Sequence, residues 1–170
     1  MLQKQNHIMS SNGESITIHD PYEEGYDFYI KDKWNNQYQF RISTFEVPSG
    51  LLSKAIEVTD DNPEREPRMF DVLSDFEADI EEAELVLKAK IKRSINRRHL
   101  VEENGKLSIG KEETLRGRIE ESDDHSDSQF ARHFVIDGRR ITIEQFVEML
   151  EPYPTFGFKF QIYDPSENIE

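Results

Sequence analysis

Cysteine is absent from the 170 residues of this chain. The absence excludes disulfides, thiolate metal sites, iron–sulfur ligation and cysteine nucleophiles, and a small domain without disulfides is typical of a reducing compartment. The chain also lacks an apolar run approaching the ~20 residues that span a bilayer, and its N-terminus lacks the apolar run of a signal peptide. We therefore expect a soluble, cytoplasmic protein that does not bind a membrane.

Basic residues are few: 21 Lys and Arg stand against 35 Asp and Glu, which gives a net charge of −14. This charge repels phosphate backbones, so it argues against direct nucleic-acid binding by the surface as a whole. Aromatic residues make up 11 % of the chain, which argues against wholesale disorder. We expect a single domain over residues 14–167, preceded by a flexible tail at 1–13 and interrupted by a mobile acidic loop at 120–128.

Alternation of apolar and polar residues predicts several strands. Tyr26–Ile30 and Tyr38–Ile42 each alternate with period two around a polar loop, which indicates a β-hairpin. Asn104-Gly105 joins two short apolar runs and is the best local signal for a second hairpin, because both turn positions need a positive φ. Further strands are predicted at residues 114–120, 132–136 and 156–162, the last with one fully apolar face.

Helical spacing dominates the middle of the chain. Within residues 68–98 neither Gly nor Pro occurs, acids fill the first half and bases fill the second, which complements a helix dipole. Residues 48–58 could hold a short helix, and Thr142 and Gln145 have the spacing of a capping box that begins another short helix. The long helix should bury one apolar stripe, namely Leu73, Phe76, Ile80, Ala83, Leu87, Ile91 and Ile95.

Together these patterns predict an α+β fold. An antiparallel sheet of hairpins should pack on one long amphipathic helix, with a short capped helix near the C-terminus. The alternation in the strands and the apolar stripe of the helix would then face each other and form the core.

Motifs with a recognisable chemistry are missing. HExxH, GxGxxG, the Walker A loop and GxSxG do not occur, so we assign no catalytic residue, no cofactor and no metal site. Asp123, Asp124, His125 and Asp127 could offer ligands to a cation, but they lack the glycine and terminal Glu of an EF-hand loop. An enzyme of unrecognised type is kept as an alternative.

The C-terminal block carries a resemblance to known proteins. The stretch VIDGRRITIEQFVEMLEPYPTFGFKFQIYDPSE, together with the preceding LRGRIEE, resembles a family of small uncharacterised bacterial and archaeal proteins over residues 100–167. That family has no assigned chemistry, so the resemblance implies a shared fold and no catalytic residue. The matching positions are turn, cap and core residues, namely Gly117, Asp137, Gly138, Thr142, Phe146, Phe158 and Ile162.

Because no motif indicates a chemistry, we expect the charge and the shape of the surface to determine the function. We predict a non-enzymatic acidic module for protein interaction or regulation, such as a subunit of a larger complex, whose partner is another protein, a basic one included. An acidic inhibitor of immunity type, which blocks a nuclease or another nucleic-acid-binding protein, is the alternative, and a homodimer through the long helix also stays open. The candidate partner-binding residues are Asp123, Asp124, Asp127, Lys88, Lys92, Arg93 and Arg97.

Overall fold

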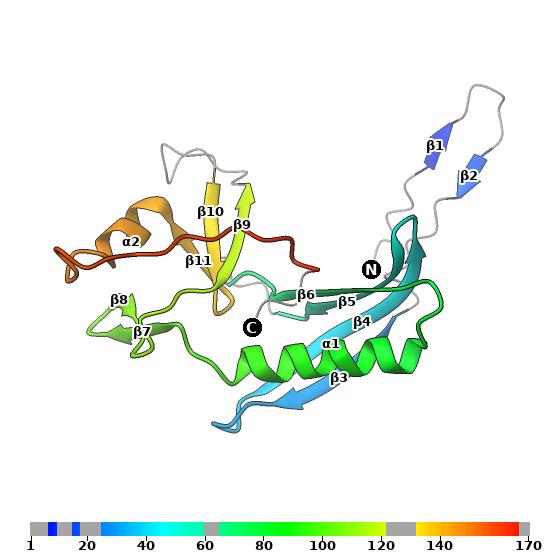
Figure 1. Ribbon diagram of the computed structural model, residues 1–170, viewed down its shortest axis with the longest axis horizontal. Coiled ribbons are helices and arrows are strands. Elements are labelled where there is room, and N and C mark those ends of the chain that lie inside the picture. Colours follow the sequence, from blue (N-terminus) through cyan, green and yellow to red (C-terminus); the bar gives the residue numbers. More distant parts are fainter. Residues whose placement is uncertain (1–6, 10–14, 18–24, 60–64, 122–131, 167–170) are drawn as a thin grey trace.

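The computed structural model describes residues 7–9, 15–17, 25–59, 65–121 and 132–166 (Figure 1). It combines antiparallel sheets with one long and one short helix, which confirms the α+β fold. In chain order its elements are β1 (His7–Met9), β2 (Ser15–Thr17), β3 (Tyr26–Lys31), β4 (Gln37–Val47), β5 (Gly50–Glu57), β6 (Met69–Ser74), α1 (Ile80–Ile95), β7 (Leu100–Glu103), β8 (Lys106–Ile109), β9 (Gly117–Glu121), β10 (Arg132–Ile136), β11 (Arg139–Thr142) and α2 (Ile143–Glu148).

The first half of the chain builds a four-stranded meander with the order β3-β4-β5-β6. The predicted hairpin of β3 and β4 is confirmed, with Phe28 opposite Phe40 in the register and Asn35 at a φ of 70° in the loop. Helix α1 contacts β5 and β6 and lies along one face of this sheet (Figure 1). Alternate sheet residues meet every third or fourth helix residue in a first core cluster, formed by Phe40, Ile42, Ala55, Val72, Leu87, Ile91 and Ile95.

Two helix predictions in this half are wrong. Residues 69–74 form β6, which pairs with β5, and α1 begins only at Ile80 behind its N-cap Asp79. Residues 50–57 form β5 rather than a short helix. In both segments a neighbouring strand forms hydrogen bonds with the backbone. The packing against that strand outweighs the helical spacing of the apolar residues. As a consequence Leu73 and Phe76 leave the predicted stripe and are exposed.

The second half builds a separate core cluster. β7 and β8 form the predicted Asn104-Gly105 hairpin, whose turn residues have φ values of 53° and 76°. β9, β10 and β11 form a three-stranded sheet, and α2 begins at Thr142 with the predicted capping box. Their buried residues are Leu100, Ile136, Ile141 and Met149, with Phe134 and Phe146 packed against them.

The strand predicted at residues 156–162 is wrong. The backbone there is irregular, and Phe158 and Ile162, which the alternation places in the core, are 94 % and 73 % exposed. Alternation makes a strand only where another strand supplies hydrogen-bond partners. Within the described residues no such partner reaches this segment.

Parts of two other predictions lie outside the described residues. Of the tail at 1–13, only His7–Met9 is described, and it pairs with β2 as strand β1. Of the acidic loop at 120–128, only Glu120 and Glu121 are described, and they end β9.

Candidate functional site

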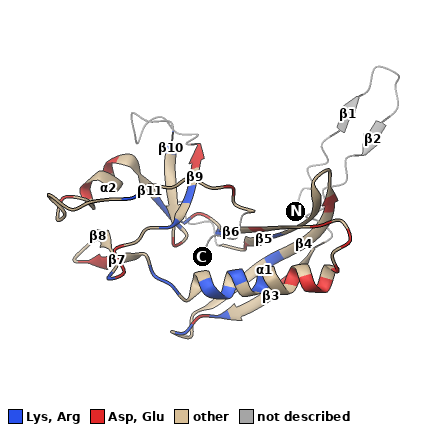
Figure 2. Ribbon diagram, in the orientation of Figure 1, with Lys and Arg blue, Asp and Glu red and all other residues tan. Residues whose placement is uncertain are grey.

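The predicted partner-binding residues fall into three groups. Asp123, Asp124 and Asp127 lie outside the described residues. Lys92 and Arg93 are exposed on the second half of α1, which carries the positive charge of this helix (Figure 2). The structure does not bring the described members of the prediction together around one site, because Lys88 and Arg97 face different neighbours.

Lys88 belongs to a polar cluster that joins α1 to the sheet. Its Nζ lies 3.4 Å from Glu84 Oε2 and 5.2 Å from the ring centroid of Tyr26. The hydroxyl of Tyr26 donates a hydrogen bond to the same carboxylate, and Thr44 donates another to its second oxygen. This cluster raises the pKa of Lys88, chiefly through the contact with Tyr26, and keeps the ammonium charged. The cluster therefore attaches the helix to β3 through Lys88 and Glu84, and to β4 through Glu84.

Arg97, by contrast, opens onto a cavity between the two core clusters. The cavity has a volume of about 290 Å³, and we call it the arginine cavity. Four of its residues are arginines, which come from the loop before β6, from the segment after α1 and from β11. Its lining consists of Tyr38, Arg68, Ile95, Arg97, Arg98, Leu100, Glu102, Asp137 and Arg139.

Asp137 organises the cavity from the turn between β10 and β11. The residue has a φ of 53°, and its Oδ2 accepts hydrogen bonds from the backbone N–H groups of His99 at 2.7 Å and Leu100 at 2.9 Å. Its own carbonyl accepts a hydrogen bond from Arg68 at 2.8 Å. Further backbone contacts, among them the antiparallel bridge between Arg65 and Arg139, join the same two parts of the chain. The turn thus links the first core cluster to the second.

Two arginines of the cavity are held by neighbours. Arg139 forms an ion pair with Glu102 at 2.7 Å, whereas Arg68 lies with its guanidinium carbon 4.8 Å from the ring centroid of Tyr38. Arg68 Nη1 is buried, and among the described residues it finds no hydrogen-bond acceptor, since the buried Glu57 lies 3.8 Å away. A buried donor without an acceptor is costly unless a ligand or water completes it.

The other two arginines carry charge without a carboxylate partner. Arg98 stacks on Trp34, with its guanidinium carbon 3.8 Å from the ring centroid, and Lys33 lies over the same ring at 4.4 Å. Neither Arg97 nor Arg98 has a side-chain ion pair within the part of the chain that the structure describes. The basic end of α1 therefore continues into a cavity with unneutralised guanidinium groups.

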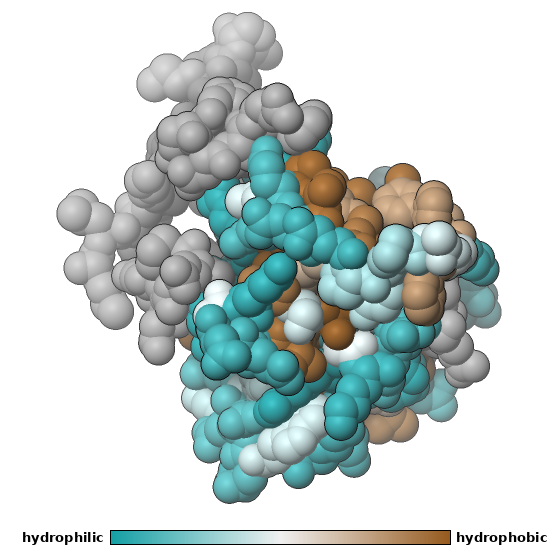
Figure 3. All heavy atoms as spheres, turned by 90° about the vertical axis from the view of Figure 1, so that its left-hand side faces the viewer, coloured by the Kyte–Doolittle hydropathy of each residue, from teal (hydrophilic) through white to brown (hydrophobic). Residues whose placement is uncertain are grey.

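A second surface lies at the other end of the C-terminal half. We call Phe156, Phe158, Phe160 and Ile162 the aromatic row, and all four are exposed. For residues 157–163 the described residues supply no backbone hydrogen bond. Figure 3 looks onto the end of the molecule that holds α2 and the β7–β8 hairpin, and apolar residues gather on its surface there.

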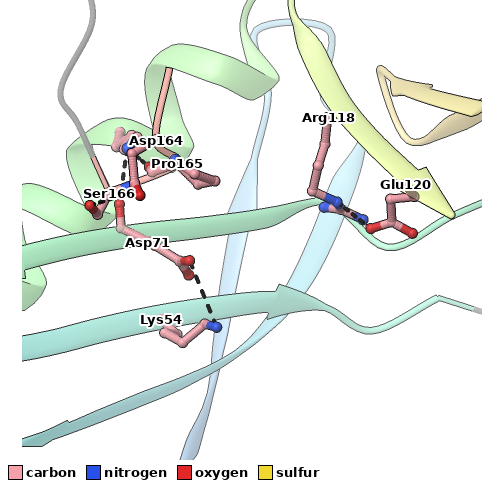
Figure 4. A network of polar contacts seen from close by, with 8 residues as sticks. Lys54, Asp71, Arg118, Glu120, Asp164, Pro165 and Ser166 are labelled. Atoms are coloured by element: carbon pink, nitrogen blue, oxygen red, sulfur yellow. Dashed lines mark hydrogen bonds and ion pairs between the residues drawn. The ribbon is translucent and has the colours of Figure 1, made fainter. Parts of the chain in front are cut away.

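The end of this segment is tied back to the first half of the chain. Lys90 of α1 donates hydrogen bonds to the carbonyl oxygens of Asp71 at 2.9 Å and Pro165 at 2.8 Å. Figure 4 shows the Asp71 side chain pointing to Lys54 beside the segment that carries Asp164 and Pro165, and the same view includes the Arg118–Glu120 pair of β9. The aromatic row is thus fixed at its C-terminal side while its apolar side chains stay in solvent.

Across the described ranges, no group of three or more His, Asp or Glu side chains could hold a metal ion. No helix among the described residues is long and apolar enough to cross a membrane.

Two family models match the chain. Residues 14–96 match a domain of unknown function, DUF7686, and residues 97–167 match another domain of unknown function, DUF7713. The C-terminal match is thus to an uncharacterised domain family, as the resemblance implied. The two matches meet directly after α1, where the first core cluster gives way to the second. No curated protein and no solved structure matches the chain.

Most of the arginine cavity was missed by sequence reasoning, which singled out Arg97 alone. Arg68, Arg98 and Arg139 come from three separate segments, so no spacing along the chain relates them. The paired arginines at 97–98 and 139–140 were the available signal, but pairs of bases are also common on solvated surfaces.

Proposed function

We propose that this protein is a non-enzymatic interaction module that docks another protein through the aromatic row. The carrying observation is that four large apolar side chains alternate along an extended segment and stay exposed, although burying each would gain about 1.5–3 kcal/mol. The backbone N–H and C=O groups of residues 157–163 also have no hydrogen-bond partners in the described structure, and the edge strand of a partner's sheet could supply them. If this segment adds as a strand to a partner's sheet, its apolar side chains become buried and its backbone groups become hydrogen-bonded at the same time.

The charge of the chain favours a different protein over a second copy as the occupant. Each copy carries a net charge of −14, so bringing two copies together is opposed by repulsion. Acidic residues flank the aromatic row in the sequence, Glu148 at the end of α2 and Asp164 after the row, and add to the negative charge of this part of the chain. We therefore propose a partner with an open sheet edge, an apolar groove beside it and basic residues at its rim.

The acidic inhibitor is the second candidate, and the segment before α1 together with its first turn favours it. Asp75 and Glu77 before the helix and Glu81 and Glu82 in its first turn are exposed, and the apolar Phe76 is exposed among them. An acidic surface with an apolar anchor suits a basic, nucleic-acid-binding partner. Such a partner would leave the complex at moderate salt, whereas a partner held by the aromatic row would stay.

A pair of matched variants tests the role of the aromatic row. Phe158→Ser and Phe160→Ser remove apolar side chains that are 94 % and 64 % exposed, and Lys159→Gln changes the residue between them. In co-purification from the native cell, we expect the partner to be lost with either Phe variant and retained with Lys159→Gln. All three variants should unfold at the wild-type denaturant midpoint, because the side chains are exposed.

Hydrogen exchange supplies the second measurement. The amides of residues 157–163 should exchange rapidly in the purified protein and become protected in the reconstituted complex. Protection of these amides in the protein alone, or a partner that binds both Phe variants with wild-type affinity, contradicts the proposal. A concentration-dependent increase in mass by light scattering that Phe158→Ser abolishes would instead identify a second copy as the occupant.

A further inference from the structure

We infer that the arginine cavity binds a small phosphate-bearing anion, a ligand that the docking function of the aromatic row does not require. The inference rests on one juxtaposition: four arginines from three parts of the chain line one cavity in a protein whose total charge is −14. The four positively charged side chains repel one another, so the fold has to hold them together at the cavity.

Carboxylates neutralise only two of these arginines. Arg139 pairs with Glu102 at 2.7 Å, and Arg68 lies 3.8 Å from the buried Glu57, while the Asp137 carboxylate accepts hydrogen bonds from the backbone N–H groups of His99 and Leu100. The positive charge left at the lining is that of Arg97 and Arg98, for which the described residues supply no ion pair. A phosphate group, which carries about −1.5 to −2 at neutral pH, complements these two guanidinium groups.

The arginines are also prepared to donate hydrogen bonds. Stacking on Trp34 fixes the plane of Arg98, and stacking on Tyr38 together with the hydrogen bond to the Asp137 carbonyl fixes Arg68. Arg68 Nη1 is buried 3.8 Å from the Glu57 carboxylate, so the guanidinium groups that are exposed at the cavity are those of Arg97 and Arg98. Guanidinium groups that are already oriented lose little side-chain entropy when they bind a phosphate through paired hydrogen bonds.

The size and the surroundings of the cavity select a small ligand. A volume of about 290 Å³ lies at the lower end of ordinary ligand pockets and accommodates a phosphate with a short substituent. A long polyanion would in addition meet Glu102 at the lining and the negative charge of the whole molecule. Free phosphate and a phosphate monoester share the recognised group, so the experiment has to distinguish them.

Calorimetric titration of the full chain with inorganic phosphate, pyrophosphate and phosphoserine tests the inference. The titrations are made at constant ionic strength in chloride, so that screening does not change between ligands. We expect saturable one-to-one binding of at least one ligand, weakened about tenfold or more in Arg97→Gln and in Arg98→Gln. Stronger binding of phosphoserine than of inorganic phosphate would identify a monoester as the ligand, and the reverse would identify the free anion.

Lys92→Gln is the matched control, because it removes one exposed positive charge from α1 outside the cavity lining. It should leave the affinity within about twofold of wild type, since charges in water act weakly at a distance. Absence of binding to all three ligands overturns the inference, as does a loss in Lys92→Gln equal to that in Arg97→Gln. Binding of a duplex oligonucleotide in the absence of pyrophosphate binding would overturn it in favour of a nucleic-acid surface.

The variants of the cavity and of the aromatic row separate the two proposals. Arg97→Gln should leave partner capture by the aromatic row intact, and Phe158→Ser should leave the phosphate affinity intact. A failure of one proposal therefore does not decide the other.

Discussion

Asp137 shows how much of the junction depends on one side chain. Its positive φ suits the turn between β10 and β11, as the Asp137-Gly138 pair indicates, while its carboxylate satisfies two backbone donors at the start of β7. Hydrogen bonds to a charged group contribute about 1.5–3 kcal/mol, more than neutral ones. The turn is a local property, whereas His99 and Asp137 are 38 positions apart in the sequence, so the second role becomes visible only in the folded chain.

His133 gives the protein a pH-dependent stability. The residue is buried on β10, and neither ring nitrogen has a hydrogen-bond partner among the described residues. Burial lowers the pKa of His133, the positive charge of Arg140 lowers it further, and Glu66, whose Oε1 lies 3.8 Å from Nε2, opposes the shift only in part. The folded state therefore holds His133 neutral.

The sign of the effect follows from proton linkage. Above the ordinary histidine pKa of 6.5 neither state binds this proton, so the stability is fully present there. Below that pH the unfolded chain takes up a proton that the folded chain resists, and the free energy of unfolding decreases. Urea unfolding of wild type and His133→Gln between pH 7.5 and 5.5 checks this, and the variant should show the smaller decrease. Equal slopes for the two proteins would contradict the prediction.

At the scale of elements, local signals placed the hairpin turns and the capping box of α2 correctly. Asn104-Gly105 adopts the positive φ pair of a tight hairpin, and Thr142 and Gln145 form their capping box. These signals act through contacts a few residues apart, so the sequence contains all that they need. The prediction of the long helix was wrong at its beginning, where the structure depends on a neighbouring strand. The backbone groups of β6 form hydrogen bonds with β5, which lies outside the segment itself.

The two aromatic residues Phe40 and Phe76 test the corrected core. Phe40 on β4 is fully buried and contacts Phe70 edge-on, whereas Phe76 precedes α1 and is 62 % exposed. Phe40→Ala should lower the free energy of unfolding by about 3–5 kcal/mol, because it opens a cavity in the first core cluster. Phe76→Ala should change it by about 0.5 kcal/mol or less. Chemical denaturation measures both, and a large loss in Phe76→Ala would restore the helical stripe that the sequence suggested.

At the scale of the whole molecule, two core clusters share one junction. The first is built from β3 to β6 and α1, the second from the elements after residue 99, and the family models divide the chain at the same place. Across the junction run the hydrogen bond of Arg68 to Asp137, that of Arg118 to Pro67, and the Lys90 link to Pro165. The arginine cavity lies within this junction, so a bound anion would contact both halves.

The single domain over residues 14–167 stays a prediction, and cooperativity tests it. We expect one unfolding transition, because hydrogen bonds such as those of Arg68 to the Asp137 carbonyl and of the Glu66 N–H to the Gly138 carbonyl join the two halves. Phe40→Ala in the first core cluster and Ile141→Ala in the second should each move the whole transition, observed by circular dichroism and by Trp34 fluorescence together. A variant that splits the curve into two steps would show two independently folding domains.

The sequence by itself determined the α+β class, the hairpin turns, the capping box of α2 and the negative net charge, because each depends on composition or on contacts between near neighbours in the chain. Tertiary structure alone decided that residues 69–74 pair as a strand, that the aromatic row remains in solvent, and that arginines from three segments line one cavity. The physical reason is the same in all three cases. Strand pairing and the convergence of like charges depend on groups distant in the sequence, and only the folded chain brings those groups within hydrogen-bonding or electrostatic range.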